Sequence, residues 1–158
     1  IVARTGWTTT DLKNAIDEES PLNDFDLVTL LIGVNNQFQN RSFSLYESEF
    51  IELANSAKSL GGDDAENVIV LSIPDYSYTP FGQNFNVQNI RSEIQAYNSF
   101  TQEHCEADGL TYVYITDITE QGLDNASLVA SDGLHPSALA YSRFVDRLMP
   151  LALTKLDR

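Results

Sequence analysis

An acid and a histidine stand three positions apart near the end of the sequence, within Ser131-Asp132-Gly133-Leu134-His135-Pro136-Ser137. Gly133 permits a backbone turn and Pro136 fixes the angle just past the histidine, so this segment cannot be regular helix or strand. A carboxylate on such a turn can accept the Nδ1 proton of the imidazole, which leaves Nε2 free to take a proton. Asp132 and His135 are therefore candidate catalytic residues. The alternative interpretation is a loop aspartate that caps backbone amides above a packed histidine.

Two further motifs each follow a predicted strand. These are Gly6 and the run Gly33-Val34-Asn35-Asn36. The Asn35 amide could donate a hydrogen bond to an oxygen that becomes negative during a reaction, and the Gly6 N–H could do the same because no Cβ shields it. Glycine and asparagine also simply end strands and cap helices. In open parallel sheets, sites form at the carboxyl ends of the strands, where both motifs are expected to lie.

The elements that must position these residues follow from hydrophobic periodicity. Apolar runs predict strands at residues 1–4, 27–32, 68–73 and 110–115, and the run at 27–32 is typical of a strand covered on both faces. Helices are expected at 10–19 with Thr8 or Thr9 as the N-cap, from the capping box at Ser44 to Gly61, at 88–106, and after Ser137, with Pro150 kinking or ending the last one. This alternation predicts one domain, residues 1–158, with a parallel sheet in a three-layer α/β/α sandwich.

Composition excludes several classes of partner. The formal net charge is −14, and such a surface repels phosphate backbones and anionic headgroups, so we expect neither nucleic acid nor a membrane surface as partner. No apolar run approaches the length of a membrane span. The single cysteine, Cys105, cannot form an internal disulfide and leaves the compartment open. His104, beside Cys105, lacks further ligands at metal-binding spacing.

In the order of its motifs the chain resembles the GDSL/SGNH hydrolases, serine esterases and lipases built on a flavodoxin-like sheet. The resemblance covers essentially the whole chain and rests on Gly6, on Gly33 with Asn35, and on Asp132 with His135. It implies that His135 is the general base, that Asp132 orients it, and that Gly6 and Asn35 form an oxyanion hole. It also implies that no metal or organic cofactor is required. The acidic surface disfavours a lipase that works on anionic lipid interfaces and favours a small acyl or carbohydrate-linked ester as substrate. Asn36 stands where the family more commonly has Asp.

The family's nucleophile block, Gly-Asp-Ser, is absent. The nearest string, Gly62-Asp63-Asp64, lacks the serine and precedes the wrong strand. Aligned to the family, the chain is expected to be incomplete at its N-terminus, without a strand–helix–strand unit of roughly 30 or more residues. The family's strand order 2-1-3-4-5 makes the absent first strand a central one. We therefore expect a segment from the same gene product or from another chain to fill the gap, and this chain alone to be inactive.

The loop from Pro74 to Phe85 is rich in aromatic residues. Tyr76, Tyr78 and Phe81 are candidates for substrate binding, because aromatic side chains there could line an acyl pocket or stack on a sugar ring; they could equally seal the sheet edge. Two other functions stay open. One is a non-catalytic module that binds a sugar or acyl ligand, and the other is a flavodoxin-like receiver or nucleotide-binding domain. No glycine-rich phosphate loop supports the latter.

Overall fold

The structure, a computed structural model, describes residues 1–157. At its centre is a three-stranded parallel sheet with strand order β1-β2-β3. The strands are β1 (Val28–Leu30), β2 (Val68–Leu71) and β3 (Thr111–Val113). The helices are α1 (Thr9–Glu19), α2 (Val34–Phe38), α3 (Phe43–Leu60), α4 (Val87–Asp108), α5 (Thr116–Thr119) and α6 (Ala138–Leu156), with 3-10 turns η1 (Ala65–Asn67), η2 (Tyr76–Tyr78), η3 (Gly82–Asn84) and η4 (Ala126–Leu128). Within residues 1–157, no helix combines the length and apolar character needed to cross a membrane.

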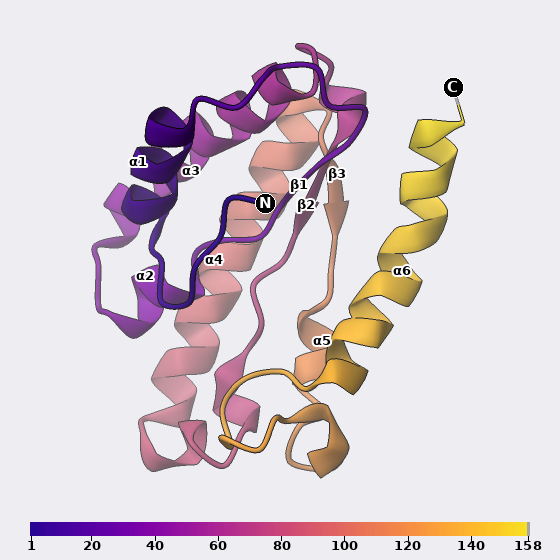
Figure 1. Cartoon of the computed structure of the whole chain (residues 1–158). Coiled ribbons are helices and arrows are strands. Elements are labelled where there is room, and N and C mark those ends of the chain that lie inside the picture. Colours follow the sequence, from indigo (N-terminus) through magenta and orange to yellow (C-terminus); the bar gives the residue numbers. More distant parts are fainter. Residues whose placement is uncertain (158) are drawn as a thin grey trace.

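Helices cover both faces of the sheet (Figure 1). On one face, α1, α3 and α4 enclose the larger apolar cluster, in which Tyr46, Phe50 and Ile94 are fully buried. On the other face, α6 packs over a smaller cluster that includes Ile69 and Phe144. The three-layer α/β/α architecture predicted from the sequence is confirmed.

The first predicted strand is not formed. Residues 1–4 are irregular, and Ile1 is fully exposed. A strand needs a neighbour with which to pair its backbone groups, and no strand of the described chain pairs with this segment. β1 is consequently an edge strand, shorter than predicted. Thr29 is exposed and Leu31 is 39% exposed, so the expectation of a strand covered on both faces was wrong.

Two helix boundaries differ from those predicted. Thr8, one of the two predicted N-caps, caps α1, and it forms a capping box with Asp11. α3 begins before the predicted Ser44, because Ser42 accepts the N–H of Leu45 at 3.3 Å. Pro150 does not end α6, which continues to Leu156. The last turn is held by tertiary contacts, because Ala152 and Lys155 are buried, and the Lys155 ammonium donates to the Glu66 carbonyl at 2.5 Å.

Candidate active site

The Asp132–His135 pair lies on a tightly bonded loop before α6. Oδ2 of Asp132 lies 2.7 Å from Nδ1 of His135, and Oδ1 accepts the backbone N–H groups of Leu134 and His135 at 2.9 and 3.0 Å. Gly133 adopts φ = 71°, a conformation that favours glycine, and its N–H donates to Ala130. The loop therefore presents the carboxylate to the imidazole without help from distant elements.

These contacts fix the charge and the tautomer of the pair. The N–H of Leu134, the imidazole of His135 and the N–H of His135 lower the pKa of Asp132 to about 2. An ionised carboxylate only accepts hydrogen bonds, so Nδ1 of His135 must carry the proton that lies between them. Nε2 is left unprotonated in the neutral ring, as a general base requires.

The turn after β1 carries the candidate amide donor. Gly33 has φ = 127°, and a Cβ there would lie 2.6 Å from a ring carbon of the buried Tyr46, so conformation and space both require glycine. Asn35 follows in the first turn of α2, and its Nδ2 donates to the Trp7 carbonyl at 3.0 Å. That bond uses one of the two N–H groups on Nδ2 and holds the side chain in a fixed orientation.

The segment around Gly6 is tied to α2 as well. Gln39 donates from Nε2 to the Gly6 carbonyl at 3.0 Å, and Asn35 holds the neighbouring Trp7 carbonyl. Gly6 has φ = 85°, while a Cβ at this position would meet no atom within 4 Å. The glycine is therefore required by the backbone conformation rather than by crowding, and the space beside it is open to a ligand.

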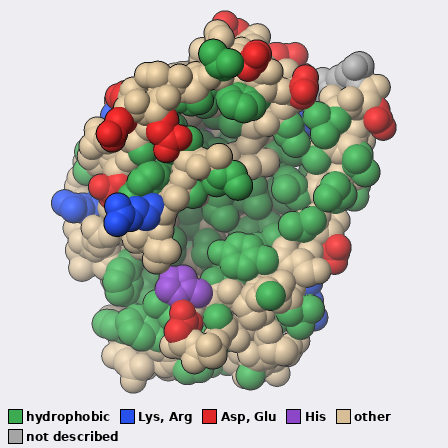
Figure 2. All heavy atoms as spheres, viewed as in Figure 1, with side chains coloured by type: hydrophobic (Ala, Val, Ile, Leu, Met, Phe, Trp, Pro, Cys, Tyr) green, Lys and Arg blue, Asp and Glu red, His purple; other side chains and the backbone are tan. Residues whose placement is uncertain are grey.

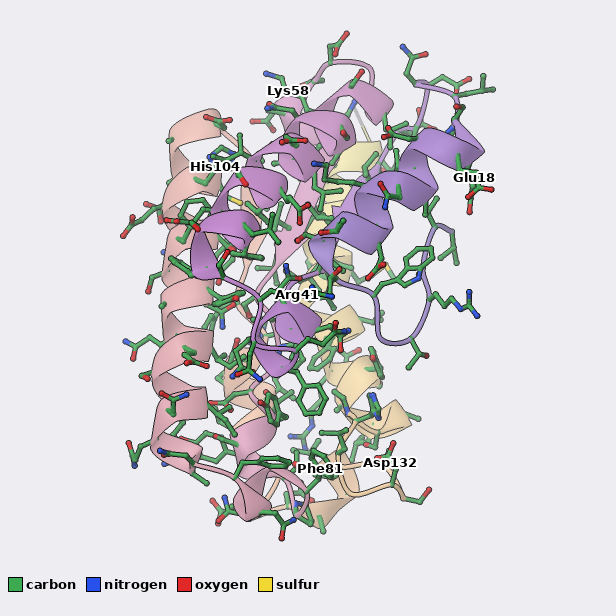
Figure 3. All side chains as sticks on the ribbon, turned by 90° about the vertical axis from the view of Figure 1, so that its left-hand side faces the viewer. Glu18, Arg41, Lys58, Phe81, His104 and Asp132 are labelled. Carbon is green, nitrogen blue, oxygen red and sulfur yellow. The ribbon has the colours of Figure 1, made fainter. Side chains whose placement is uncertain are left out.

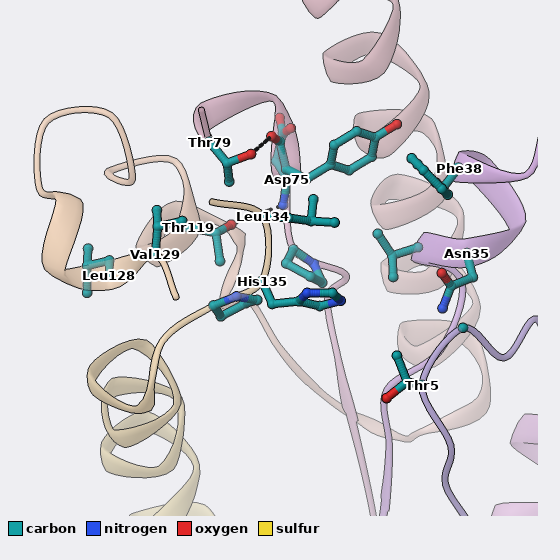
Figure 4. Close-up of a pocket in the computed structure, with 15 residues that line it drawn as sticks. Thr5, Asn35, Phe38, Asp75, Thr79, Thr119, Leu128, Val129, Leu134 and His135 are labelled. Carbon is teal, nitrogen blue, oxygen red and sulfur yellow. Dashed lines mark hydrogen bonds between the residues drawn. The ribbon is translucent and has the colours of Figure 1, made fainter. Parts of the chain in front are cut away.

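Gly6, Asn35 and His135 meet at one place although they are remote in the sequence. All three line a cavity of about 250 Å³ at the carboxyl ends of the strands (Figure 4). All three also line a second, adjoining hollow of about 290 Å³ beside β1. The walls of the first cavity are mainly apolar and include residues that the sequence analysis did not single out: Val34, Phe38, Leu128, Val129 and Leu134. Leu128 and Val129 lie in the segment 116–130, where no hydrophobic periodicity indicates which side chains face inward.

The three aromatic candidates separate in the structure. Tyr76 lines the cavity shared by Gly6, Asn35 and His135 and packs edge-on against Phe38, with ring centroids 5.7 Å apart. Tyr78 lines a different cavity, between α4 and β3. Phe81 lines neither of these cavities; its N–H donates to the Gly133 carbonyl at 3.0 Å, so it supports the Asp132–His135 loop. Figure 3 shows Phe81 and Asp132 at the same end of the molecule.

The other histidine lies far from this site. His104 is on α4, stacked against Phe100 and edge-on to Phe50, well away from Asp132 in Figure 3. Asp108 lies 3.4 Å from its Nε2. Among residues 1–157, no cluster of three or more His, Cys, Asp or Glu side chains could hold a metal ion.

The GDSL-like Lipase/Acylhydrolase family matches residues 1–143, which cover the Gly6, Asn35 and Asp132/His135 positions. The chain belongs to this family of hydrolases. No curated protein matches the sequence closely enough to add a more specific function.

Solved structures of GDSL-like hydrolases share the fold. A GDSL-like lipase from Bacteroides thetaiotaomicron has 16% identity and a TM-score of 0.65, with 94% of this chain and 72% of that chain covered. A lipase/acylhydrolase from Enterococcus faecalis has 22% identity and a TM-score of 0.60, with 95% of this chain and 71% of that chain covered. An α/β hydrolase enzyme from the metagenome of Lake Arreo, Spain, has 17% identity and a TM-score of 0.58, with 96% of this chain and 70% of that chain covered. At these identities the likeness establishes the fold alone.

Proposed function

We propose that this family member hydrolyses a carboxylic ester with a serine nucleophile that lies outside residues 1–158. The observation that carries the proposal is the meeting of Gly6, Asn35 and His135 at one cavity, with Asp132 2.7 Å from His135. The serine Oγ would attack the ester carbonyl while Nε2 of His135 takes its proton and returns it to the departing alcohol. Asp132 would hold the ring and stabilise the imidazolium that forms.

The oxyanion would be held by the N–H of Gly6 and by the Asn35 amide. One N–H of Asn35 Nδ2 donates to the Trp7 carbonyl, so the other N–H can donate to the oxyanion. Both donors are fixed before substrate arrives, which is the condition under which such groups lower a barrier. One donor of this kind contributes about 2.7–4 kcal/mol to transition-state stabilisation.

The two adjoining cavities supply no evident nucleophile of their own. Neither a serine nor a cysteine lines them, and Thr5 is the hydroxyl residue common to both. Cys105 is fully buried, and burial raises the pKa of its thiol to about 12, so it is not a reactive thiolate. These observations support a serine supplied by another segment.

The edge of β1 supports a specific position for that segment. β1 pairs only with β2 among the strands of residues 1–157, so its other edge offers free backbone donors and acceptors. β1 runs toward Gly33 and Asn35. A parallel strand on its free edge would end at the same rim, and the turn after that strand would enter the 290 Å³ hollow next to His135.

An apolar helix face borders the same place. Tyr141 lines the hollow, and Val145 and Met149 follow it at four-residue intervals on α6, with 51%, 45% and 46% of their surfaces exposed. Figure 2 shows apolar side chains gathered in this hollow. A covering strand with apolar side chains would bury them, and we propose that the same gene product supplies this strand together with the serine.

The catalytic cavity supports a small acyl group as part of the substrate. Its volume of about 250 Å³ is below the roughly 300–1,000 Å³ of sites for drug-sized ligands. Phe38, Tyr76, Leu134 and the neighbouring apolar side chains would hold a hydrocarbon chain, whereas few polar groups are present to bind a sugar inside it.

The decisive experiment assays the full-length gene product on p-nitrophenyl acetate and butyrate. His135→Gln should lower kcat by a factor on the order of 10⁶, because the base is lost. His104→Gln is the matched control and should keep turnover within a few-fold of wild type. Turnover near wild type in the His135 variant would refute the mechanism.

Two further experiments locate the nucleophile. A fluorophosphonate probe should label the full-length product at one serine outside residues 1–158 and should leave the isolated 158-residue chain unlabelled. Thr5→Val in the full-length product should leave turnover within a few-fold of wild type. Loss of turnover in that variant would place the nucleophile inside this chain.

The absence of a nucleophile from both cavities also favours a second function, a non-catalytic module that binds an acyl or sugar ligand. This alternative predicts that the full-length product binds an ester analogue saturably, neither hydrolyses p-nitrophenyl esters nor reacts with the fluorophosphonate, and keeps its affinity in the His135→Gln variant.

A further inference from the structure

A second cavity, separate from the catalytic one, lies between α4 and β3. Its volume is about 580 Å³. Gln88, Gln95 and Gln102 line it from α4 at seven-residue intervals, which places them along one face of the helix over about 21 Å. Tyr112 of β3 and Tyr114, just after the strand, line the same groove. The groove is therefore long, polar and partly aromatic, unlike the apolar catalytic cavity.

Two of the groove's carboxamides are available to a ligand, whereas Nε2 of Gln102 already donates to Glu106 at 2.8 Å. Gln88 and Gln95 are exposed, and neither side chain makes a hydrogen bond to any residue in 1–157. Each carboxamide presents a donor and an acceptor side by side, which matches the paired hydroxyl groups of a sugar. Tyr114 is 44% exposed, so its ring offers a surface on which the C–H face of a pyranose can pack.

The charged groups of the groove exclude polyanions. Arg91 is the groove's one cation; it lies over the Tyr78 ring, 4.1 Å from the centroid, and its Nε donates to Ser77 at 3.2 Å. Two acids, Asp75 and Glu120, line the same groove. Burial and the carboxylates of Asp75 and Asp117 raise the pKa of Glu120, because they disfavour its ionised form. A hydroxyl group that donates a hydrogen bond to the ionised carboxylate would stabilise it. A neutral, hydroxyl-rich ligand fits this set.

A peptide strand does not fit, although β3 is an edge strand. The Arg147 guanidinium donates to the Tyr114 carbonyl and is held there by Asp117, through contacts of 2.5 and 3.0 Å. The backbone acceptor directly after β3 is thus already occupied, which disfavours an added strand at this position. An apolar ligand is disfavoured as well, because Ile94 is the one aliphatic side chain among the lining residues.

We propose that the groove between α4 and β3 binds a neutral oligosaccharide. Asp75 lines both this groove and the catalytic cavity, so the bound glycan would extend from the back of the catalytic rim along α4. The proposal does not depend on hydrolysis, because binding belongs to residues that are all present in this chain.

The test titrates the ¹⁵N-labelled 158-residue chain with cellohexaose, xylohexaose, mannohexaose and N-acetylchitohexaose. We expect at least one of these to shift the side-chain amide signals of Gln88, Gln95 and Gln102 saturably. Gln95→Ala and Tyr114→Ala should each weaken that binding at least tenfold. Glu103→Ala, an exposed position on α4 outside the groove, is the matched control and should leave affinity unchanged.

Three outcomes would overturn the proposal. The first is that no hexasaccharide shifts the groove signals at millimolar concentration. The second is that binding persists unchanged in both groove variants, or that the shifts map to Asn35 and His135 instead. The third is that an oligogalacturonate hexamer binds more tightly than every neutral one. Because Gln95 is exposed on a helix that tolerates alanine, loss of binding in its variant cannot be attributed to misfolding.

Discussion

At the scale of single residues, hydrogen bonds fix both the position and the charge of the Asp132 carboxylate in the candidate site. Two backbone N–H groups and an imidazole converge on it although its side chain is half exposed. Hydrogen bonds rather than burial therefore determine its charge, and the Gly133 turn supplies the geometry.

The first prediction concerns the titration of Asp132 in the isolated chain. Its carboxyl ¹³C signal should titrate with a midpoint at about 2. Because the folded pKa is depressed, this carboxylate stabilises the fold above the unfolded pKa of about 3.9, and the contribution is lost as the pH falls toward 2.

A variant separates the contributions of His135 and of the backbone N–H groups to the lowered pKa of Asp132. His135→Gln should raise the midpoint only part of the way, because the Leu134 N–H is the largest contributor and remains in place. A midpoint near the ordinary aspartate value in the wild-type chain would contradict the structure of this loop.

At the scale of elements, a buried polar network joins α1, α2 and α3 next to Asn35, the candidate amide donor. Asn36 accepts the N–H of Thr9 at 2.9 Å and donates to the Thr9 hydroxyl at 2.6 Å. That hydroxyl in turn donates to the Glu49 carboxylate at 2.5 Å. Since the Thr9 hydroxyl gives its proton to Glu49, position 36 must donate. This requirement gives a physical reason for asparagine at position 36, where the sequence analysis noted that aspartate is commoner in the family.

Asn36→Asp should therefore destabilise the chain at neutral pH. An aspartate at this fully buried position cannot donate when ionised, and it would face Glu49 across one hydroxyl. We expect a loss of about 1–3 kcal/mol at pH 7.5, measured by urea unfolding.

The pH dependence provides the check on this variant. The folded pKa of the new carboxyl should be raised, so the unfolded state ionises first and stability falls as the pH rises above about 4. Part of the loss should therefore be recovered at pH 4.5. Asn125→Asp is the control, since Asn125 is a partly exposed N-cap for which Asp serves equally well. Equal stability of wild type and Asn36→Asp at pH 7.5 would refute the role of the network.

At the scale of the whole molecule, the free edge of β1 and the apolar face of α6 form one open surface. Leu31, Tyr141, Val145 and Met149 contribute large exposed apolar side chains to it. A contiguous apolar surface of this kind marks an interaction site. The same hollow reaches Gly6, Asn35 and His135, so covering it and completing the active site would be a single structural event.

A charged substitution tests whether this surface is covered. Val145→Asp in the full-length product should lower the free energy of unfolding by about 1–3 kcal/mol, because a carboxylate would be buried without a partner. In the isolated 158-residue chain the same change should have little effect, since Val145 is exposed there.

Ser142→Asp provides the matched surface control on α6. It should alter stability by no more than about 0.5 kcal/mol in either form. Equal effects of Val145→Asp in the full-length and isolated forms would refute a covering segment at this face.

The sequence by itself determined the alternation of strands and helices, the three-layer class and the Asp132–His135 pair. These depend on local signals: apolar runs, caps such as Thr8, and an acid and a base three residues apart around a glycine turn. Local chemistry acts over a few residues, so it can be read without coordinates.

Only the tertiary structure decided what depends on contacts between remote segments. It brought Gly6, Asn35 and His135 to one cavity, separated Tyr76 from Tyr78, and left residues 1–4 without a strand partner. Strand formation requires a neighbour for the backbone groups, and the lining of a cavity depends on which distant elements meet across it. The sequence of one segment contains neither of these facts.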